Sequence, residues 1–123
     1  HRGVCYGLVE PAYEQGRVLA MRLAGRDSSY CGSVVSTNLK VSGVRVFSAG
    51  DYLGEGDARR IVCMDRRMGL YRKLVVREGR LMGAILVGDT SGAADFLDLI
   101  RAGEDISSMR DELMFGPSVQ KAA

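Results

Sequence analysis

The sequence is poor in the side chains on which most enzyme sites depend. Histidine occurs once, at His1, and the three cysteines, Cys5, Cys31 and Cys63, form no C-x-x-C pair. A Ser-His-Asp or Cys-His arrangement would need that terminal histidine, and a zinc or iron-sulfur site would need closely spaced cysteines. We therefore expect neither catalytic residues nor a metal site here. The cysteines are expected to be reduced thiols that serve as small apolar side chains.

Long apolar runs and strong charge are also missing. No stretch approaches the roughly 18 apolar residues of a membrane-spanning helix, and no signal-peptide pattern opens the sequence. This predicts a cytoplasmic protein with no membrane contact. The net charge of +2 is too small to indicate a nucleic-acid partner.

Possible catalytic carboxylates and a possible phosphate loop have simpler interpretations. Acids at loop ends and on helix faces are expected to be solvated or capping groups; they are Asp51, Asp57, Asp65, Glu10 and Glu14. The glycine-rich segment 50–56 lacks the Lys and Ser/Thr of a phosphate loop. We expect it to be a surface loop.

Glycine is abundant, with 16 residues, and helps to place the first element. Pro11 near the start and Gly25 at the end predict a helix over about 11–24. Its apolar residues cover most of its circumference, so it needs partners on several sides. Gly16 within it is either simply tolerated or allows close approach of another backbone or a ligand. The polar segment 26–32 is expected to be a linker.

The middle of the chain reads as a sheet. Apolar alternation over 39–46, broken at Ser42-Gly43, predicts two short strands or one bent strand, and 61–64 predicts another. The runs 70–76 and 81–87 predict a hairpin whose Glu78-Gly79 turn needs a positive φ at its second central residue.

Helical spacing returns after this hairpin. Asp89 or Thr90 is expected to cap a helix that ends at Gly103 and lies across the sheet. A short helix over about 108–114 is expected to follow. The sequence therefore predicts an α+β fold: a small, mainly antiparallel sheet with helices packed on it, preceded by a separate helix.

Two features leave a functional and a structural interpretation open. The N-terminus of the first helix has unpaired N–H groups that could face the pyrimidine edge of a flavin, but every helix has such an end. A basic region could steer an acidic electron carrier or another domain, or could only keep strand surfaces soluble. It comprises Arg59, Arg60, Arg66, Arg67, Arg72, Lys73, Arg77 and Arg80.

Several ordered motifs resemble one family. They are YGLVEPAYEQ (6–15), GSVVSTNLKVSGV (32–44), FSAGD (47–51), VGDT (87–90) and DISSMRD (105–111) followed by Phe115-Gly116. Together these motifs resemble the large subunit of assimilatory-type NAD(P)H nitrite reductases, in the C-terminal part of the FAD/NAD-linked reductase module. The resemblance spans nearly the whole chain.

The resemblance implies a division of the chain. Residues 1–31 would be the tail of the FAD-binding domain and a linker, 32–116 the small C-terminal α+β domain, and 117–123 a loose tail. Tyr6, Gly7, Leu8 and Val9 would run close to FAD in the full-length protein. Sirohaem and an iron-sulfur cluster would lie in other domains, and no cofactor is expected in these residues alone.

The resemblance also implies a role and partners. The chain would be a non-catalytic fragment, as its non-initiator first residue also suggests, that supports the FAD unit during electron transfer to nitrite. Its partners would be the FAD- and NAD(P)H-binding domains of the same chain, with a homodimer or electron-carrier contact in addition. Because the dinucleotide-binding glycine motifs are absent, these residues are not expected to reduce nitrite alone. The alternative is a stand-alone protein–protein interaction or dimerisation module with no redox role.

Overall fold

The chain folds into two compact units, His1–Val35 and Ser36–Ala123. The computed structural model describes residues 1, 3, 5–109 and 113. The first unit contains α1 (Val9–Leu23), and the second contains a five-stranded sheet and one further helix. Each unit is considered separately below.

The first unit is built around α1, whose boundaries match the sequence prediction within two residues. The helix ends as expected, because Gly25 adopts a φ of 76° and the N–H of Arg26 donates to the carbonyl of Met21 at 3.0 Å. This is the bonding of a left-handed C-terminal cap. Pro11 is the buried residue of the helix, whereas Val9, Tyr13 and other apolar side chains are exposed.

The second unit is a single antiparallel sheet in the order β1-β2-β5-β4-β3. Its strands are β1 (Ser36–Val41), β2 (Val44–Gly50), β3 (Arg59–Asp65), β4 (Leu70–Arg77) and β5 (Arg80–Val87). The segment 39–46 is thus two strands joined at Ser42-Gly43. In the β4–β5 hairpin both Glu78 and Gly79 have positive φ values, 50° and 74°. This confirms the predicted tight turn.

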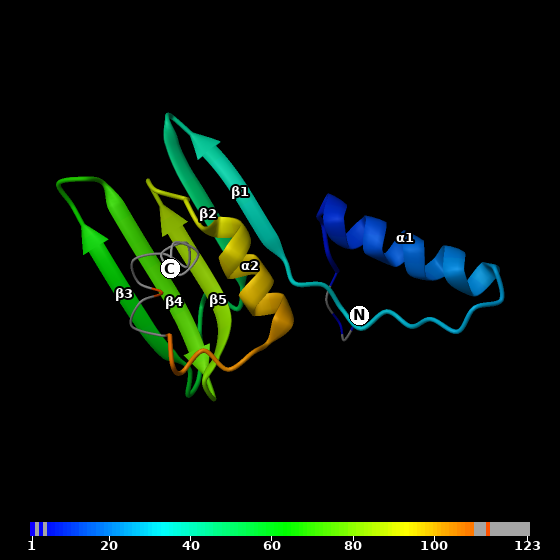
Figure 1. The fold of residues 1–123 in the computed structure, drawn as a ribbon. Coiled ribbons are helices and arrows are strands. Elements are labelled where there is room, and N and C mark those ends of the chain that lie inside the picture. Colours follow the sequence, from blue (N-terminus) through cyan, green and yellow to red (C-terminus); the bar gives the residue numbers. More distant parts are fainter. Residues whose placement is uncertain (2, 4, 110–112, 114–123) are drawn as a thin grey trace, which may run out of the picture. The chain divides into compact units, whose positions relative to one another are not determined.

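The helix α2 (Ala93–Ala102) lies on one side of the sheet, against β2 and β5 (Figure 1). Phe96 on this helix is fully buried against Phe47 and Leu86 of these two strands. The core lies between α2 and the sheet, and Ile106 and Leu113 complete it after the helix. The predicted α+β architecture, with a helix across an antiparallel sheet, is confirmed.

Two local predictions have a different outcome. Neither Asp89 nor Thr90 caps α2: the N-cap residue is Gly92, and it makes no side-chain capping bond. Instead the Asp89 carboxylate accepts the N–H of Ser91 at 2.8 Å, so it stabilises the turn before the helix. The final helix predicted over 108–114 and the tail from 117 lie largely outside the described residues.

Candidate docking face and its clamped loop

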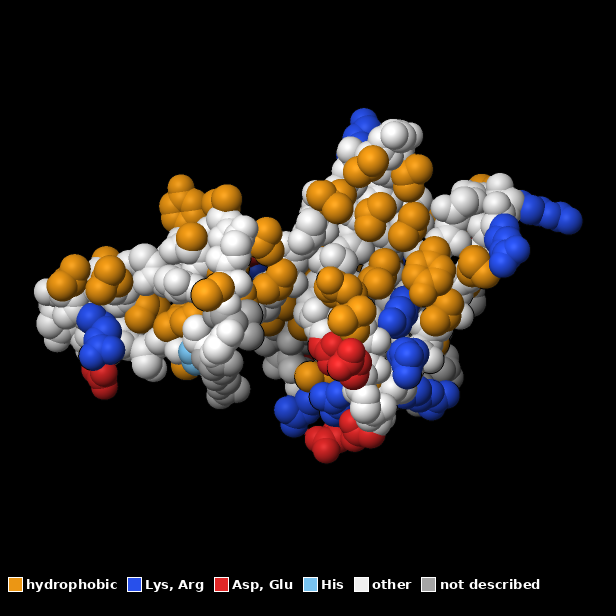
Figure 2. Space-filling view, turned by 180° about the vertical axis from the view of Figure 1, so that it is seen from behind, with side chains coloured by type: hydrophobic (Ala, Val, Ile, Leu, Met, Phe, Trp, Pro, Cys, Tyr) orange, Lys and Arg blue, Asp and Glu red, His pale blue; other side chains and the backbone are white. Residues whose placement is uncertain are grey.

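The side of the sheet away from α2, here called the outer face, is apolar across all five strands. Side chains alternate along a strand, and paired residues share a side, so the register assigns each residue to one face. The apolar residues of the outer face are Leu39, Val41, Val44, Val46, Val62, Met64, Tyr71, Val75, Ile85 and Val87. Figure 2 shows hydrophobic side chains gathered over the sheet on this side.

Much of this apolar surface is open. Leu39 is 52% exposed, Val62 52% and Met64 55%. No Asp or Glu occupies an outward position on any strand, and the outward cations are Arg60, Lys73, Arg77 and Arg80, the last two beside the β4–β5 turn. The outer face is therefore a hydrophobic surface with few charges, unlike the ordinary polar exterior of a half-buried sheet.

One end of the outer face is covered by the loop 51–57, which connects β2 to β3. The register of β4 and β5 shifts between Val75 and Val76, which leaves Met82 as the extra residue of a bulge. The Met82 carbonyl accepts the N–H of Asp51 at 2.9 Å. The bulge thus frees a backbone group that anchors the start of the loop.

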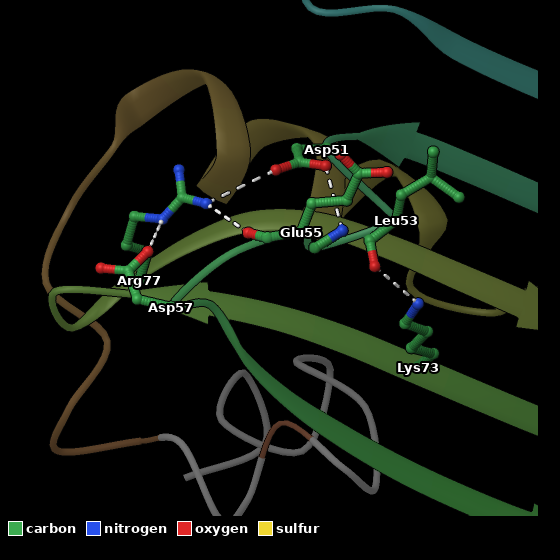
Figure 3. A network of polar contacts seen from close by, with 7 residues as sticks. Asp51, Leu53, Glu55, Asp57, Lys73 and Arg77 are labelled. Carbon is green, nitrogen blue, oxygen red and sulfur yellow. Dashed lines mark hydrogen bonds and ion pairs between the residues drawn. The ribbon is translucent and has the colours of Figure 1, made fainter.

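Arg77 ties this loop to the sheet from β4 (Figure 3). Its guanidinium donates to the carbonyl of Glu55 at 3.0 Å and lies 4.0 Å from an oxygen of Asp51. Its Nε lies 3.1 Å from Asp57 Oδ1 in an ion pair that is not also a hydrogen bond. Lys73 donates from Nζ to the Leu53 carbonyl at 3.1 Å. We call these contacts the Arg77 clamp.

The loop approaches the strands so closely that two positions require glycine. A Cβ on Gly83 would lie 2.3 Å from the backbone carbon of Asp51, and a Cβ on Gly54 would lie 2.8 Å from Val75 Cγ1. Gly54 also has a φ of 65°, which side-chain-bearing residues rarely adopt. As a result Val75 is fully buried, whereas Tyr52 and Leu53 remain exposed beside the uncovered part of the outer face.

The basic region does not form one positive face. Arg72 lies on the α2 side, 5.7 Å from the centre of the Phe96 ring and 3.8 Å from Asp89. Arg77 and Lys73 hold the loop, while Arg66 and Arg67 lie in the turn between β3 and β4. Because strand residues alternate between sides, the dense run of cations in sequence is divided among three locations.

Hydrogen bonding lowers the pKa values of two carboxyl groups. The hydroxyl and N–H of Ser91 donate to Asp89 and lower its pKa below the ordinary 3.8, with a smaller contribution from Arg72. Ser107 lowers the pKa of Asp105 in the same way. Both groups belong to turns, and neither lies on the outer face.

The residues that the resemblance assigns to FAD lie at the start of α1. Tyr6 packs edge-on against Tyr30 with ring centres 6.2 Å apart, and its hydroxyl accepts the N–H of Ser33. Leu8 is the N-cap residue, and its side chain makes no capping bond. Val9 is 73% exposed, and a Cβ on Gly7 would meet no atom within 4 Å. The four residues thus line an open segment of backbone.

The other candidate reactive groups serve local structure or remain at the surface. The Asp65 carboxylate accepts the N–H groups of Arg67 and Met68, and Glu14 accepts the hydroxyl of Ser33. All three cysteines are free, but all are exposed, so the expected role as packed apolar side chains is wrong for this chain. Among the described residues, no group of three or more His, Cys, Asp and Glu side chains could hold a metal ion.

A helix must be both long and apolar to cross a membrane. Neither helix in the described part of the chain is long and apolar enough to cross one.

The sheet and its helix define the class of protein. The chain belongs to the family of rubredoxin NAD⁺ reductase C-terminal domains, whose model matches residues 36–104. It is therefore a domain associated with a reductase.

Individual relatives agree with the resemblance noted in the sequence. The chain is 43% identical to a nitrite reductase [NAD(P)H] of Bacillus subtilis (strain 168), covering 99% of this chain and 15% of the relative. It is 34% identical to a nitrite reductase (NADH) large subunit of Escherichia coli (strain K12), covering 89% of this chain and 13% of the relative. The resemblance to nitrite reductases is thus confirmed, and the chain spans a small part of each relative.

A solved structure resembles the fold. The crystal structure of an NADH:rubredoxin oxidoreductase from Clostridium acetobutylicum matches with a TM-score of 0.59 at 25% identity. The match covers 85% of this chain and 27% of that one.

Proposed function

We propose that this chain is the end of the FAD-binding domain and the small C-terminal domain of an NAD(P)H nitrite reductase large subunit. The identity of 43% over 99% of the chain carries the proposal. In this reading residues 1–31 complete the FAD-binding domain and 32–116 support it. The chain contributes contacts and orientation, while cofactors bound largely elsewhere supply the redox chemistry. The setting is cytoplasmic.

The start of α1 has properties that fit a flavin. The first N–H groups of a helix lack intrahelical partners, and here the N-cap side chain of Leu8 supplies no bond to them. Gly7 leaves space beside the backbone. When bound, FAD would supply hydride and electron transfer; the protein's part is to orient it. The backbone of Tyr6 to Val9 would lie along the flavin, with N–H groups available to its carbonyl oxygens.

The exposure of α1 supports the same assignment. Val9, Tyr13, Leu19 and Leu23 are between 59% and 81% exposed. Apolar side chains on several sides of a helix are usually buried by neighbouring elements. The remainder of an FAD-binding domain would supply these neighbours. An independent interaction module would not require such a helix, and the family match favours the reductase assignment.

A substitution at Gly7 tests the flavin contact. In the full-length reductase, Gly7→Leu should lower the FAD bound per polypeptide and the NAD(P)H-dependent reduction of an artificial acceptor by a similar factor. The control is Arg26→Leu, which introduces the same side chain at an exposed position of the linker. Unchanged flavin content and activity in Gly7→Leu would remove the contact from the proposal.

The isolated chain provides a second test. Its 123 residues should neither reduce nitrite nor retain FAD after gel filtration. Stoichiometric flavin uptake by this chain alone would contradict the proposed division of labour.

The exposed turn between β3 and β4 is the proposed contact for an electron carrier or a second subunit. It presents Arg66 and Arg67 beside Met68, which is 70% exposed. In the full-length enzyme, Arg66→Glu with Arg67→Glu should reduce the dependence of electron transfer on ionic strength. An unchanged salt dependence would exclude this turn as the contact.

A further inference from the structure

The outer face presents a binding surface larger and more apolar than an isolated domain needs. Exposed apolar side chains occur on its two outermost strands and on the loop that borders it: Leu39 and Val41 of β1, Val62 and Met64 of β3, and Leu53. Soluble proteins rarely leave contiguous apolar patches of this kind uncovered, because they favour association. The face is therefore expected to be buried in the functional protein.

Its charge pattern indicates a permanent occupant. Transient electron-carrier contacts are small and about as apolar as the rest of a protein surface, whereas permanent interfaces resemble a domain core cut in half. The outer face has no outward acid, and two of its four outward cations, Lys73 and Arg77, donate to carbonyls of the loop 51–57. The exposed cations Arg66 and Arg67 lie instead in the β3–β4 turn, apart from the apolar centre.

The share of each relative that the match covers indicates what buries the outer face. The matched region is 27% of the NADH:rubredoxin oxidoreductase chain and 15% of the Bacillus nitrite reductase chain. The family is named as the C-terminal domain of a reductase, so in such a protein the reductase body is joined to this domain covalently. A covalently linked partner is present at a high effective concentration. It can cover the face permanently without a second molecule.

The geometry points to the outer face, extended by Tyr52 and Leu53 of the clamped loop, as the surface that seats against the reductase body of the same polypeptide. This inference rests on the proposed function and adds the surface through which the domain acts. The Arg77 clamp positions the loop: it fixes 51–57 over Val75 and Gly83 and presents Tyr52 and Leu53 at the border of the apolar surface. Arg77 is thus a positioning residue and contacts no substrate.

Hydroxyl-radical footprinting tests the surface directly. Leu39, Val62 and Met64 should react in the 123-residue chain and be protected in the full-length reductase at every protein concentration. Equal reactivity in both would overturn the inference. Protection that disappears on dilution would assign the face to a second copy. Protection that appears only when an electron-carrier protein is added would assign it to that partner, and either result would also overturn the inference.

A pair of neighbouring substitutions provides the matched control. Leu39 lies on the outer face and Asn38, also exposed, lies on the α2 side of the same strand. In the full-length reductase, Leu39→Glu should increase the rate of proteolytic release of the domain by about tenfold or more, because a buried unpaired charge is strongly unfavourable. Asn38→Glu should leave the rate unchanged. Equal rates for the two variants would contradict the inference.

The outcome is separable from that of the proposed function. If FAD content responds to Gly7→Leu but the outer face stays reactive, the reductase assignment stands and the docking surface is wrong. If the full-length protein holds no FAD but protects the face, the docking surface stands and the flavin role fails.

Discussion

The two sides of the sheet differ in a way that distinguishes folding from function. On the α2 side Phe47, Leu86 and Phe96 are at most 2% exposed, and they form a core that the domain completes itself. On the outer face residues of similar hydrophobicity, such as Val62 and Met64, are more than half exposed. Hydrophobicity alone does not separate the two groups. The difference is that the residues on the α2 side pack against partners within the domain. Only the outer face therefore offers apolar area for a further contact.

The largest expected effect on stability appears when a substitution on the α2 side of the sheet is compared with one on the outer face. In the 123-residue chain, Phe96→Ala should lower the free energy of unfolding by about 3–5 kcal/mol, because it leaves a cavity under α2. Met64→Ala should change it by less than about 0.5 kcal/mol, as expected of an exposed position. Urea denaturation followed by circular dichroism measures both. A comparable loss in the two variants would show that the faces are equally important to folding.

The next effect concerns the covered end of the outer face. Gly83→Ala should destabilise the chain by about 1–3 kcal/mol, since the added Cβ would overlap the backbone of Asp51 and Tyr52. Ser48→Ala, an outward change on β2, should be nearly neutral. Denaturation midpoints measure the difference. If Gly83→Ala is as stable as the parent chain, the loop does not pack against β5 as closely as described.

The fold could largely be predicted from the sequence because its signals are local. Pro11 and Gly25 mark α1, Glu78-Gly79 marks the hairpin, and the spacing from Ala93 to Ile100 marks α2. The predicted N-cap of α2 was wrong because an Asp side chain can accept a hydrogen bond from its own turn as well as from a helix end. Asp89 bonds its own turn. Position alone could not decide between them.

The docking face could not be predicted because it depends on register and on the loop. The near-continuous apolar run 81–87 is typical of a strand buried on both sides, and this was the available signal that a second surface existed. That Arg77 clamps a loop, while Arg72 lies against Phe96, follows from alternation across a bulged pair. A count of basic residues in the sequence does not contain this information.

A smaller effect is expected at the Arg77 clamp. Arg77→Met should cost about 1 kcal/mol, because its polar contacts are partly solvent-exposed and its ion pairs contribute little. The amide of Gly54, which donates to Asp51 at 3.1 Å, should exchange faster with solvent. Lys73→Met, which removes the single bond to Leu53, is the matched comparison and should have the weaker effect. Unchanged exchange at Gly54 in Arg77→Met would mean that the loop holds itself.

The smallest effect is a pH dependence on the α2 side. Hydrogen bonds from Ser91 lower the pKa of Asp89 below 3.8 in the folded chain. A lowered folded-state pKa contributes stability above the unfolded value, and that contribution is lost as the pH falls below about 4 and through the folded pKa.

Asp89→Asn should therefore cost a few tenths of a kcal/mol at pH 6, since its side chain is 49% exposed, and the cost should shrink towards pH 3. Asp27→Asn, in the linker, is the control. Because no strand of the outer face carries an outward acid, Leu39→Ala should leave the pH dependence of stability in this range unchanged. A cost in Asp89→Asn that is constant from pH 6 to pH 3 would show that the carboxylate does not stabilise its turn through these bonds.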